Sequence, residues 1–227
     1  MSNEKYAQWI KTLADLQGGR PGYSDQQPES IAALVELAIH VEPTKVIEIG
    51  TSYGLSLRAW LEVPDLEVIA IDMFFDPLRR SHKVLPFDWD RVDMIETDIA
   101  NVNLPALWKP DDRVIFYFDC HGAHQMNYVL ARGVPFLPEE SVFAVDDVWY
   151  SHEELNEDNV QVFFDEVVLS QVDASAPHCL RPKDYAPYWE GGSFFSFDEI
   201  APLMQYVNER EITLNFEPGV KLVWWWV

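Results

Sequence analysis

Cysteine, basic residues and long apolar runs are all scarce in this sequence. Its two cysteines, Cys120 and Cys179, are too few for a disulfide framework, and no pair of thiols has the spacing of a zinc site. No apolar run approaches the roughly 18 residues of a membrane span, and the first residues lack the apolar centre of a signal peptide. We therefore expect a cytoplasmic protein in a reducing compartment, without membrane contact.

The shortage of positive charge limits the partners. The chain has 16 lysines and arginines against 38 acidic residues, a formal net charge of -22. Such a chain repels the phosphate backbone of nucleic acids and anionic membrane surfaces, whereas small hydroxylated substrates are compatible with it. With 227 residues, 48% of them hydrophobic, it has the length of one domain and enough apolar residues for a sizeable core.

A strand, a glycine turn and a helix are predicted within residues 45–61. A short apolar run leads to Gly50, and a helical apolar pattern begins after Gly54. The two glycines permit a tight turn and close approach of the backbone to a ligand, and the helix offers free N–H groups at its start. A dinucleotide site would place a glycine where Ser52 stands, so a nicotinamide-dependent oxidoreductase is disfavoured.

The pattern Glu48-x-Gly50-x-x-x-Gly54 resembles motif I of the class I S-adenosylmethionine-dependent methyltransferases. The resemblance implies that the turn passes under the methionine part and ribose of the cofactor, with Glu48, Gly50, Thr51, Ser52 and Gly54 as binding residues. It also implies a Rossmann-like three-layer α/β sandwich whose mostly parallel seven-stranded sheet ends in an antiparallel C-terminal strand. A glycine turn in another kind of α/β protein is the alternative.

Further strands alternate with predicted helices after this turn, which favours a parallel sheet with right-handed crossovers. They are predicted within residues 66–74, 92–96, 114–118 and 141–150. Acidic residues stand where these strands end: Asp72, Asp98, Asp119, Asp146 and Asp147. Because ligands gather outside the carboxyl ends of such strands, we expect these carboxylates at one edge of the sheet, together with Glu48.

Two of these acids are candidates for the nucleoside part of the cofactor. Asp72 stands about 20 residues after Gly50, the spacing at which a carboxylate accepts hydrogen bonds from ribose hydroxyls. The alternative is that it caps the following helix. By the methyltransferase resemblance, Asp98 would bond the adenine amino group and Asp119 would border the cofactor pocket.

Asp119, Asp146 and Asp147 follow two adjacent predicted strands, where their charges repel unless a cation lies among them. Three hard oxygen donors suit Mg²⁺, with Mn²⁺ or Ca²⁺ as substitutes. Over roughly residues 28–150 the chain resembles the metal-dependent small-molecule O-methyltransferases, a group that includes catechol O-methyltransferase-like and antibiotic sugar enzymes. It is also similar to cephalosporin hydroxylase-like proteins. Helix-capping or substrate-binding roles for Asp146 and Asp147 are the alternative.

Histidines flank the position of the general base. Several sugar methyltransferases of this group carry a histidine three residues after the metal-binding aspartate, where this chain has Gly122. His121 and His124 lie on either side, and a histidine of ordinary pKa can accept a hydroxyl proton at neutral pH. For each of them, a capping or solvent-facing role is the alternative.

Segments of different composition flank and interrupt the expected domain. Residues 1–28 are predicted to form a helix and a loop, which is either a lid over the site or a connector, before a methyltransferase domain at 29–227. An aromatic-rich insertion at about 174–196 would wall a substrate pocket or pack a subunit interface. A C-terminal hairpin carries three tryptophans at 224–226 on alternating faces. We expect a second subunit to cover that edge, in a homodimer or higher homo-oligomer.

These observations predict an enzyme that transfers a methyl group from S-adenosylmethionine to a hydroxyl of a sugar, a phenol or another specialised metabolite, with Mg²⁺ or another divalent cation. A metal-independent methyltransferase and a non-catalytic binding or assembly protein on the same fold are the alternatives, since fold does not fix function.

Overall fold

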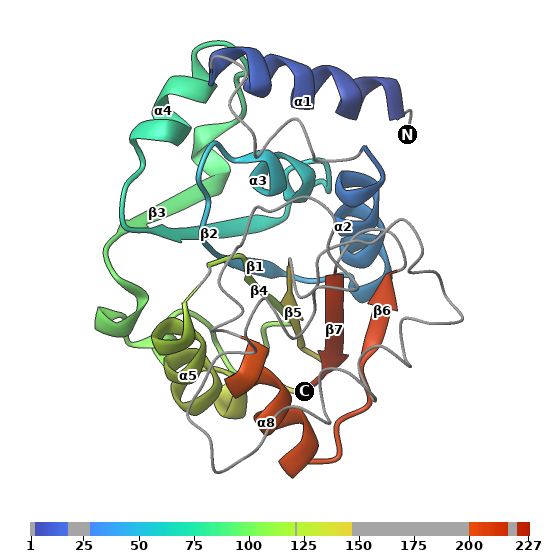
Figure 1. Cartoon of the computed structure of the whole chain (residues 1–227), viewed down its shortest axis with the longest axis vertical. Coiled ribbons are helices and arrows are strands. Elements are labelled where there is room, and N and C mark those ends of the chain that lie inside the picture. The colour runs from blue at the N-terminus through green and yellow to red at the C-terminus, as the bar shows by residue number, and fades with distance from the viewer. Residues whose placement is uncertain (1–2, 18–27, 121, 147–199, 218–221) are drawn as a thin grey trace, which may run out of the picture.

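The computed structural model describes residues 3–17, 28–120, 122–146, 200–217 and 222–227. In this part of the chain one seven-stranded sheet has the order β3-β2-β1-β4-β5-β7-β6 (Figure 1). Its strands are β1 (Lys45–Ile49), β2 (Glu67–Asp72), β3 (Val92–Glu96), β4 (Val114–Phe118), β5 (Val142–Val145), β6 (Asn215–Glu217) and β7 (Leu222–Trp226). The pairs among β1 to β5 are parallel, and β7 is antiparallel to both of its neighbours. The expected Rossmann-like architecture is confirmed.

Helices cover both faces of the sheet and complete three layers (Figure 1). One face packs against α1 (Asn3–Leu16), α2 (Pro28–Val41), α3 (Leu55–Trp60) and α4 (Asp76–His82), and the other against α5 (Ala123–Arg132) and α8 (Ile200–Glu209). Short 3₁₀ turns are η1 (Trp89–Arg91), η2 (Ile99–Asn101), η3 (Leu104–Ala106) and η4 (Val134–Phe136). Because both faces are covered, β4 is apolar along its whole length and all of its residues are buried.

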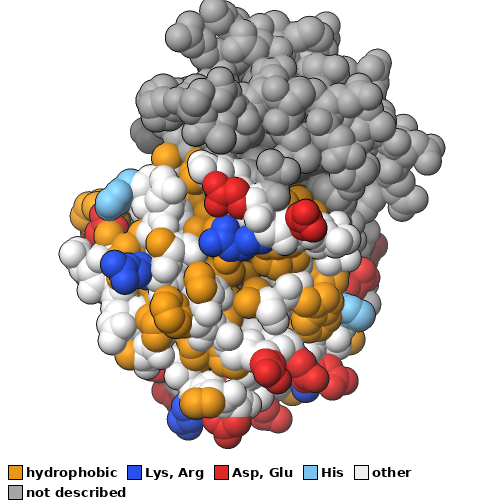
Figure 2. All heavy atoms as spheres, turned by 90° about the horizontal axis from the view of Figure 1, so that it is seen from below, with side chains coloured by type: hydrophobic (Ala, Val, Ile, Leu, Met, Phe, Trp, Pro, Cys, Tyr) orange, Lys and Arg blue, Asp and Glu red, His pale blue; other side chains and the backbone are white. Residues whose placement is uncertain are grey.

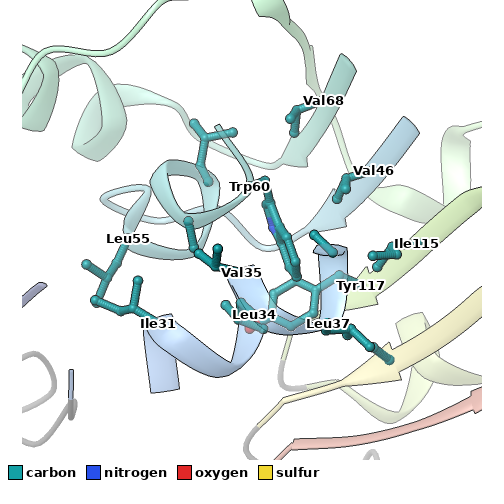
Figure 3. Close-up of a cluster of buried hydrophobic side chains, with 14 of the residues drawn as sticks. Ile31, Leu34, Val35, Leu37, Val46, Leu55, Trp60, Val68, Ile115 and Tyr117 are labelled. Atoms are coloured by element: carbon teal, nitrogen blue, oxygen red, sulfur yellow. The ribbon is translucent and has the colours of Figure 1, made fainter. Parts of the chain in front are cut away.

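The core between β4 and α3 is built on an aromatic pair. Trp60 of α3 meets Tyr117 of β4 edge to face, with ring centroids 5.2 Å apart, and both side chains are fully buried. Figure 3 shows the pair enclosed by aliphatic side chains, among them Leu37 of α2 and Ile115 of β4. A neighbouring aromatic ring in this geometry adds about 0.5–1.5 kcal/mol beyond the burial of area. The pair fixes α3, and with it the glycine turn before that helix, against the sheet.

The three C-terminal tryptophans have a different setting from the one expected. The strand that carries them, β7, lies between β5 and β6 and is not at the edge of the sheet. Trp225 packs against Phe143 at 4.9 Å between ring centroids, and Trp224 against His40 of α2 at 5.9 Å, so this chain covers both faces itself. These tryptophans therefore give no argument for a second subunit, although Trp226 is 45% exposed. The hairpin pairing is confirmed, and its turn at 218–221 lies outside the described residues.

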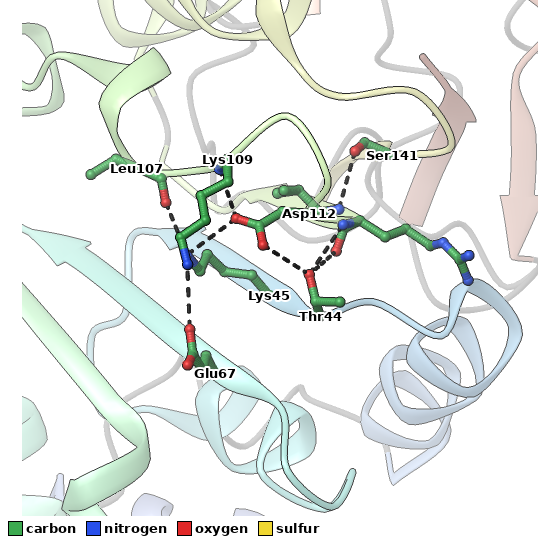
Figure 4. Close-up of polar contacts among 9 residues, drawn as sticks. Thr44, Lys45, Glu67, Leu107, Lys109, Asp112 and Ser141 are labelled. Atoms are coloured by element: carbon green, nitrogen blue, oxygen red, sulfur yellow. Dashed lines mark hydrogen bonds and ion pairs between the residues drawn. The ribbon is translucent and has the colours of Figure 1, made fainter.

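At the amino ends of β1 and β4 a polar cluster joins the two strands (Figure 4). Lys45 Nζ lies 3.4 Å from the Asp112 carboxylate and donates to the Leu107 carbonyl at 3.2 Å, while the Lys109 amide donates to Asp112 at 2.8 Å. Burial alone would raise the pKa of Asp112, but the Lys109 amide and the Lys45 charge outweigh it and lower that pKa. The Asp112 carboxylate is thus held in place by Lys45 and by the Lys109 amide.

The surface at the end where α5, α8 and the C-terminus lie is shown in Figure 2. Hydrophobic side chains cover much of this face, and several acidic side chains gather at its margin. Large exposed apolar residues in the described part of the chain include Phe136, Trp226 and Val227. Within the described ranges, no helix combines the length and the apolarity needed to cross a bilayer.

Candidate active site

Backbone hydrogen bonds between neighbouring strands bring the predicted acids to one edge of the sheet. The amide of Gly50 donates to the end of β2 at 2.9 Å, that of Asp119 to the end of β1 at 2.8 Å, and that of Asp146 to the end of β4 at 3.0 Å. The amide of Thr97, just after β3, donates to the Asp72 carbonyl at 2.9 Å. The expected series of strand ends is therefore confirmed, and the glycine turn lies in its middle.

The turn after β1 needs glycine at both predicted positions. Gly50 has a φ of 86° and Gly54 a φ of 74°, in the left-handed region that side chains disfavour. A Cβ atom at Gly50 would lie 2.1 Å from the Asp119 carbonyl oxygen, and one at Gly54 would lie 2.4 Å from the Leu78 side chain. The backbone of the turn therefore lies directly against the end of β4, where only glycine fits.

Asp72 organises this turn. Its Oδ2 atom accepts hydrogen bonds from the amides of Thr51 and Ser52 at 2.8 and 2.9 Å, and its Oδ1 atom accepts one from Phe74 at 3.1 Å. These bonds hold Ser52 at a positive φ of 48°. A carboxylate offers about four acceptor positions, so these three amide bonds leave capacity for a ribose hydroxyl. The ribose role of Asp72 stays a prediction, and its role in the turn is an addition to it.

Glu48 is buried behind the turn, on the face of β1 that packs against α3. Its Oε2 atom accepts a hydrogen bond from the indole N–H of Trp60 at 2.7 Å. Burial raises the pKa of Glu48 from 4.5 to about 7, against the Trp60 indole and the nearby side chains of Ser56 and Thr51, which lower it. Within the described part of the chain, Glu48 Oε1 and the Thr51 hydroxyl have no partner at normal hydrogen-bond geometry. Contact of Glu48 with a cofactor stays a prediction.

Arg58 binds the backbone of the turn, a role that was not predicted from the sequence. Only 3% of this residue is exposed. Its guanidinium donates to the carbonyls of Tyr53 at 2.8 Å and Gly54 at 2.6 Å, and to that of Leu85 after α4. It also lies 4.9 Å from the ring centre of Phe87. In the sequence, a basic residue on a short helix indicates an exposed position. Arg58 is buried only because α3 packs beside α4, and there its guanidinium binds the turn.

Asp119 and Asp146 lie beside one buried phenol. Tyr117 donates to Asp146 Oδ2 at 2.5 Å. The pKa of Tyr117 lies well above its ordinary value, first because of burial and then because of the negative charges of Asp146 and Asp119. Both carboxylates are thus near enough to act on the same hydroxyl. No sequence pattern indicates this role, because Tyr117 fits the apolar pattern of a core strand.

The remaining candidates are less closely tied to the turn. Asp98 accepts a hydrogen bond from the Ala100 amide at 2.9 Å and caps η2, and His124 is exposed in the first turn of α5. His121 and Asp147 lie outside the described residues, as do the segment proposed as a lid at 18–27 and the aromatic-rich insertion at 174–196. Among the described side chains no group of three His, Cys, Asp or Glu residues could hold a metal ion.

No family model and no curated protein matches the sequence. Solved structures do match. A methyltransferase from Podospora anserina bound to S-adenosylhomocysteine has 16% identity and a TM-score of 0.59, with 96% of this chain and 87% of that chain covered. A TDP-rhamnose 3'-O-methyltransferase of calicheamicin biosynthesis has 15% identity and a TM-score of 0.55, with coverages of 97% and 93%. An O-methyltransferase from Streptomyces achromogenes, involved in tomaymycin synthesis and solved with S-adenosylmethionine, has 12% identity and a TM-score of 0.59, with coverages of 100% and 91%. The chain therefore has the fold of class I S-adenosylmethionine-dependent methyltransferases.

Proposed function

We propose that this protein transfers a methyl group from S-adenosylmethionine to a hydroxyl oxygen of a small molecule, with a divalent cation held at the ends of β4 and β5. The observation that carries the proposal is the glycine turn packed against Asp119, with further carboxylates on the neighbouring strand ends. The similar structures are in several cases O-methyltransferases, and two were solved with the cofactor or its product.

The residues around the turn fit the cofactor. Gly50 and Gly54 let the turn follow a tight path against the end of β4 and against α4, and Asp72 keeps acceptor capacity for a ribose hydroxyl. Thr51, Ser52 and Glu48 complete the motif, and Asp98 lies after β3, where the adenine would be bound. When bound, S-adenosylmethionine supplies an electrophilic methyl group on a cationic sulfur.

The acids of the neighbouring strands fit a divalent cation. Asp119 and Asp146 provide hard oxygen donors on adjacent strand ends, and Mg²⁺ is commonly held by one or two carboxylates together with waters. Asp147 follows directly in the sequence and would be a third donor. When bound, such an ion lowers the pKa of a coordinated substrate hydroxyl and fixes its orientation.

His121 and His124 are the proposed acceptors of the substrate proton. His124 lies in the first turn of α5, and His121 follows Asp119 by two residues in the sequence. A neutral imidazole there takes the hydroxyl proton as the oxygen attacks the methyl group. The acceptor would be a sugar, a phenol or another hydroxylated metabolite, because an anionic substrate would meet the strongly acidic chain.

Thermal unfolding with S-adenosylmethionine, S-adenosylhomocysteine and NAD, each with and without Mg²⁺, tests the proposal. A ligand at about 100 times its dissociation constant stabilises the native state by about 2.7 kcal/mol, or roughly 5–10 °C for a chain of this size. A shift with the two adenosyl ligands but not with NAD supports methyl transfer. No shift with either adenosyl ligand at millimolar concentration contradicts it and favours a non-catalytic protein on this fold.

Metal dependence is tested on an acceptor found by screening hydroxylated compounds with the radiolabelled methyl donor. Excess chelator should abolish turnover, added Mg²⁺ should restore it, and binding of S-adenosylhomocysteine should persist in chelator. Full turnover in chelator would refute the role of the metal and leave a metal-independent methyltransferase.

A further inference from the structure

Tyr117 occupies a position from which its hydroxyl reaches the candidate metal site while its ring is locked in the core. The ring is fully buried and meets Trp60 edge to face at 5.2 Å (Figure 3). The strand register places Tyr117 beside Glu48 of β1 and Ala144 of β5, two residues before Asp146. A phenol held in this way has little freedom to move its oxygen, because packed cores keep side chains in single rotamers.

The hydroxyl of Tyr117 and the backbone of β4 hold Asp146 at two points. The Asp146 amide donates to the Phe118 carbonyl at 3.0 Å, and the Tyr117 hydroxyl donates to Asp146 Oδ2 at 2.5 Å. The direction of the second bond follows from chemistry, because an ionised carboxylate can only accept. A bond from a fixed donor to one oxygen sets the rotation of the carboxylate plane and so the direction in which the other lone pairs point.

We propose that Tyr117 is a positioning residue that holds the Asp146 carboxylate in the orientation in which it binds the divalent cation. The inference rests on the proposed function, which makes Asp146 a metal ligand. Partners in the shell behind a metal ligand fix its orientation, and their loss typically lowers metal affinity by 10- to 100-fold.

Tyr117→Phe removes the single oxygen atom that the proposal concerns and keeps the ring. Tyr128→Phe is the matched control, because the Tyr128 hydroxyl also donates one hydrogen bond, to the Val102 carbonyl at 2.6 Å and not to a carboxylate. Both variants lose one phenolic hydrogen bond. A purely structural role of Tyr117 predicts that the two variants differ little in ligand binding.

Calorimetric titration of Mg²⁺ into the full chain saturated with S-adenosylhomocysteine gives the decisive measurement. We expect the dissociation constant of Mg²⁺ to rise about 10- to 100-fold in Tyr117→Phe and to stay within about twofold in Tyr128→Phe. Affinity for S-adenosylhomocysteine without metal should stay within about twofold in both variants. The same rise in both variants, or none in Tyr117→Phe, overturns the inference and leaves the proposed function intact.

A double-mutant cycle with Asp146→Asn shows whether Tyr117 acts through Asp146. In the Asp146→Asn background, Tyr117→Phe should cause no further loss of Mg²⁺ affinity, because the effect passes through the altered carboxylate. A full additional loss would show an independent effect and overturn the inference. A wild-type protein that binds no Mg²⁺ refutes the metal part of the proposed function, and the inference with it.

Discussion

The buried Glu48 carboxyl should make the protein less stable at alkaline pH, and Glu48→Gln should remove that dependence. The side chain is wholly buried against α3, and its pKa is raised from 4.5 to about 7. Glutamine keeps the shape and the acceptor for the Trp60 indole but cannot ionise. The difference between the two proteins therefore isolates the cost of charging one buried group.

The sign follows from proton linkage. Because the folded pKa lies above the unfolded one, the folded state holds the proton between pH 4.5 and about 7 while the unfolded chain releases it. Stability is then fully present below pH 4.5 and falls as pH rises to about 7. The shift corresponds to roughly 3 kcal/mol, of which roughly 2–3 kcal/mol falls between about pH 5 and pH 8.5.

Urea unfolding at about pH 5 and pH 8.5 measures this change in wild type, Glu48→Gln and Glu139→Gln. Glu139 is exposed in the loop before β5 and serves as the control for loss of one negative charge. We expect Glu48→Gln to gain roughly 2–3 kcal/mol relative to wild type between the two pH values, and Glu139→Gln to run parallel to wild type. Parallel curves for all three proteins would refute the assignment of Glu48 as a buried, proton-binding carboxyl.

The other predictions concern the turn and the opposite edge of the sheet. Gly50→Ala should destabilise the fold by about 3 kcal/mol or more and abolish stabilisation by S-adenosylhomocysteine, because its Cβ would lie 2.1 Å from the Asp119 carbonyl oxygen at a positive φ. Gly122 has an ordinary φ of -151°, and an added Cβ would meet only the flexible side chain of Gln125. Gly122→Ala should therefore lower the free energy of unfolding by less than about 1 kcal/mol, measured by thermal unfolding. Equal losses of stability in the two glycine variants would contradict this prediction. The charged Asp112 carboxylate beside Lys45 stabilises the fold, as its lowered pKa shows, and this contribution is present above the ordinary carboxyl pKa of 3.8. Asp112→Asn should therefore be less stable than wild type above that pH, and the difference should become smaller as pH falls. Urea midpoints at about pH 6 and pH 3 test this, and a constant difference would count against it.

The fold followed from the sequence because its signals are local and repeated. Short apolar runs with turn residues at each end, separated by helical patterns, predicted the five parallel strands. The third predicted strand at 92–96, for example, is β3 (Val92–Glu96). The sequence did not show that β7 lies inside the sheet, between β5 and β6. Three tryptophans on alternating faces indicate that both faces are covered, but a pattern does not tell whether the cover comes from the same chain or from a second one.

The site was predicted less completely, because its contacts join strands far apart in sequence. The acids at strand ends were found from their position after apolar runs, and backbone hydrogen bonds between neighbouring strands confirm a common edge for Asp72, Asp119 and Asp146. Their partners were not found. Trp60 lies 12 residues from Glu48 and Tyr117 lies 29 residues from Asp146. In sequence both aromatic residues fit an apolar face, and only the crossing of α3 over the sheet and the pairing of β4 with β5 turn them into hydrogen-bond donors.

These partners change the electrostatic argument for a cation. The sequence alone does not distinguish between the acids at this edge. If all of them are charged they repel one another, and a positive charge among them would reduce that repulsion. In the structure, the pKa of Glu48 lies near neutrality, and Asp72 accepts three backbone amides, so neither depends on a metal for its place. Asp119 and Asp146 differ from these two residues in that both of their charges raise the pKa of the same hydroxyl, that of Tyr117. In the proposed function, a divalent ion at the ends of β4 and β5 would lie beside the turn that is assigned to the methyl donor, which is where a substrate hydroxyl must be placed for methyl transfer.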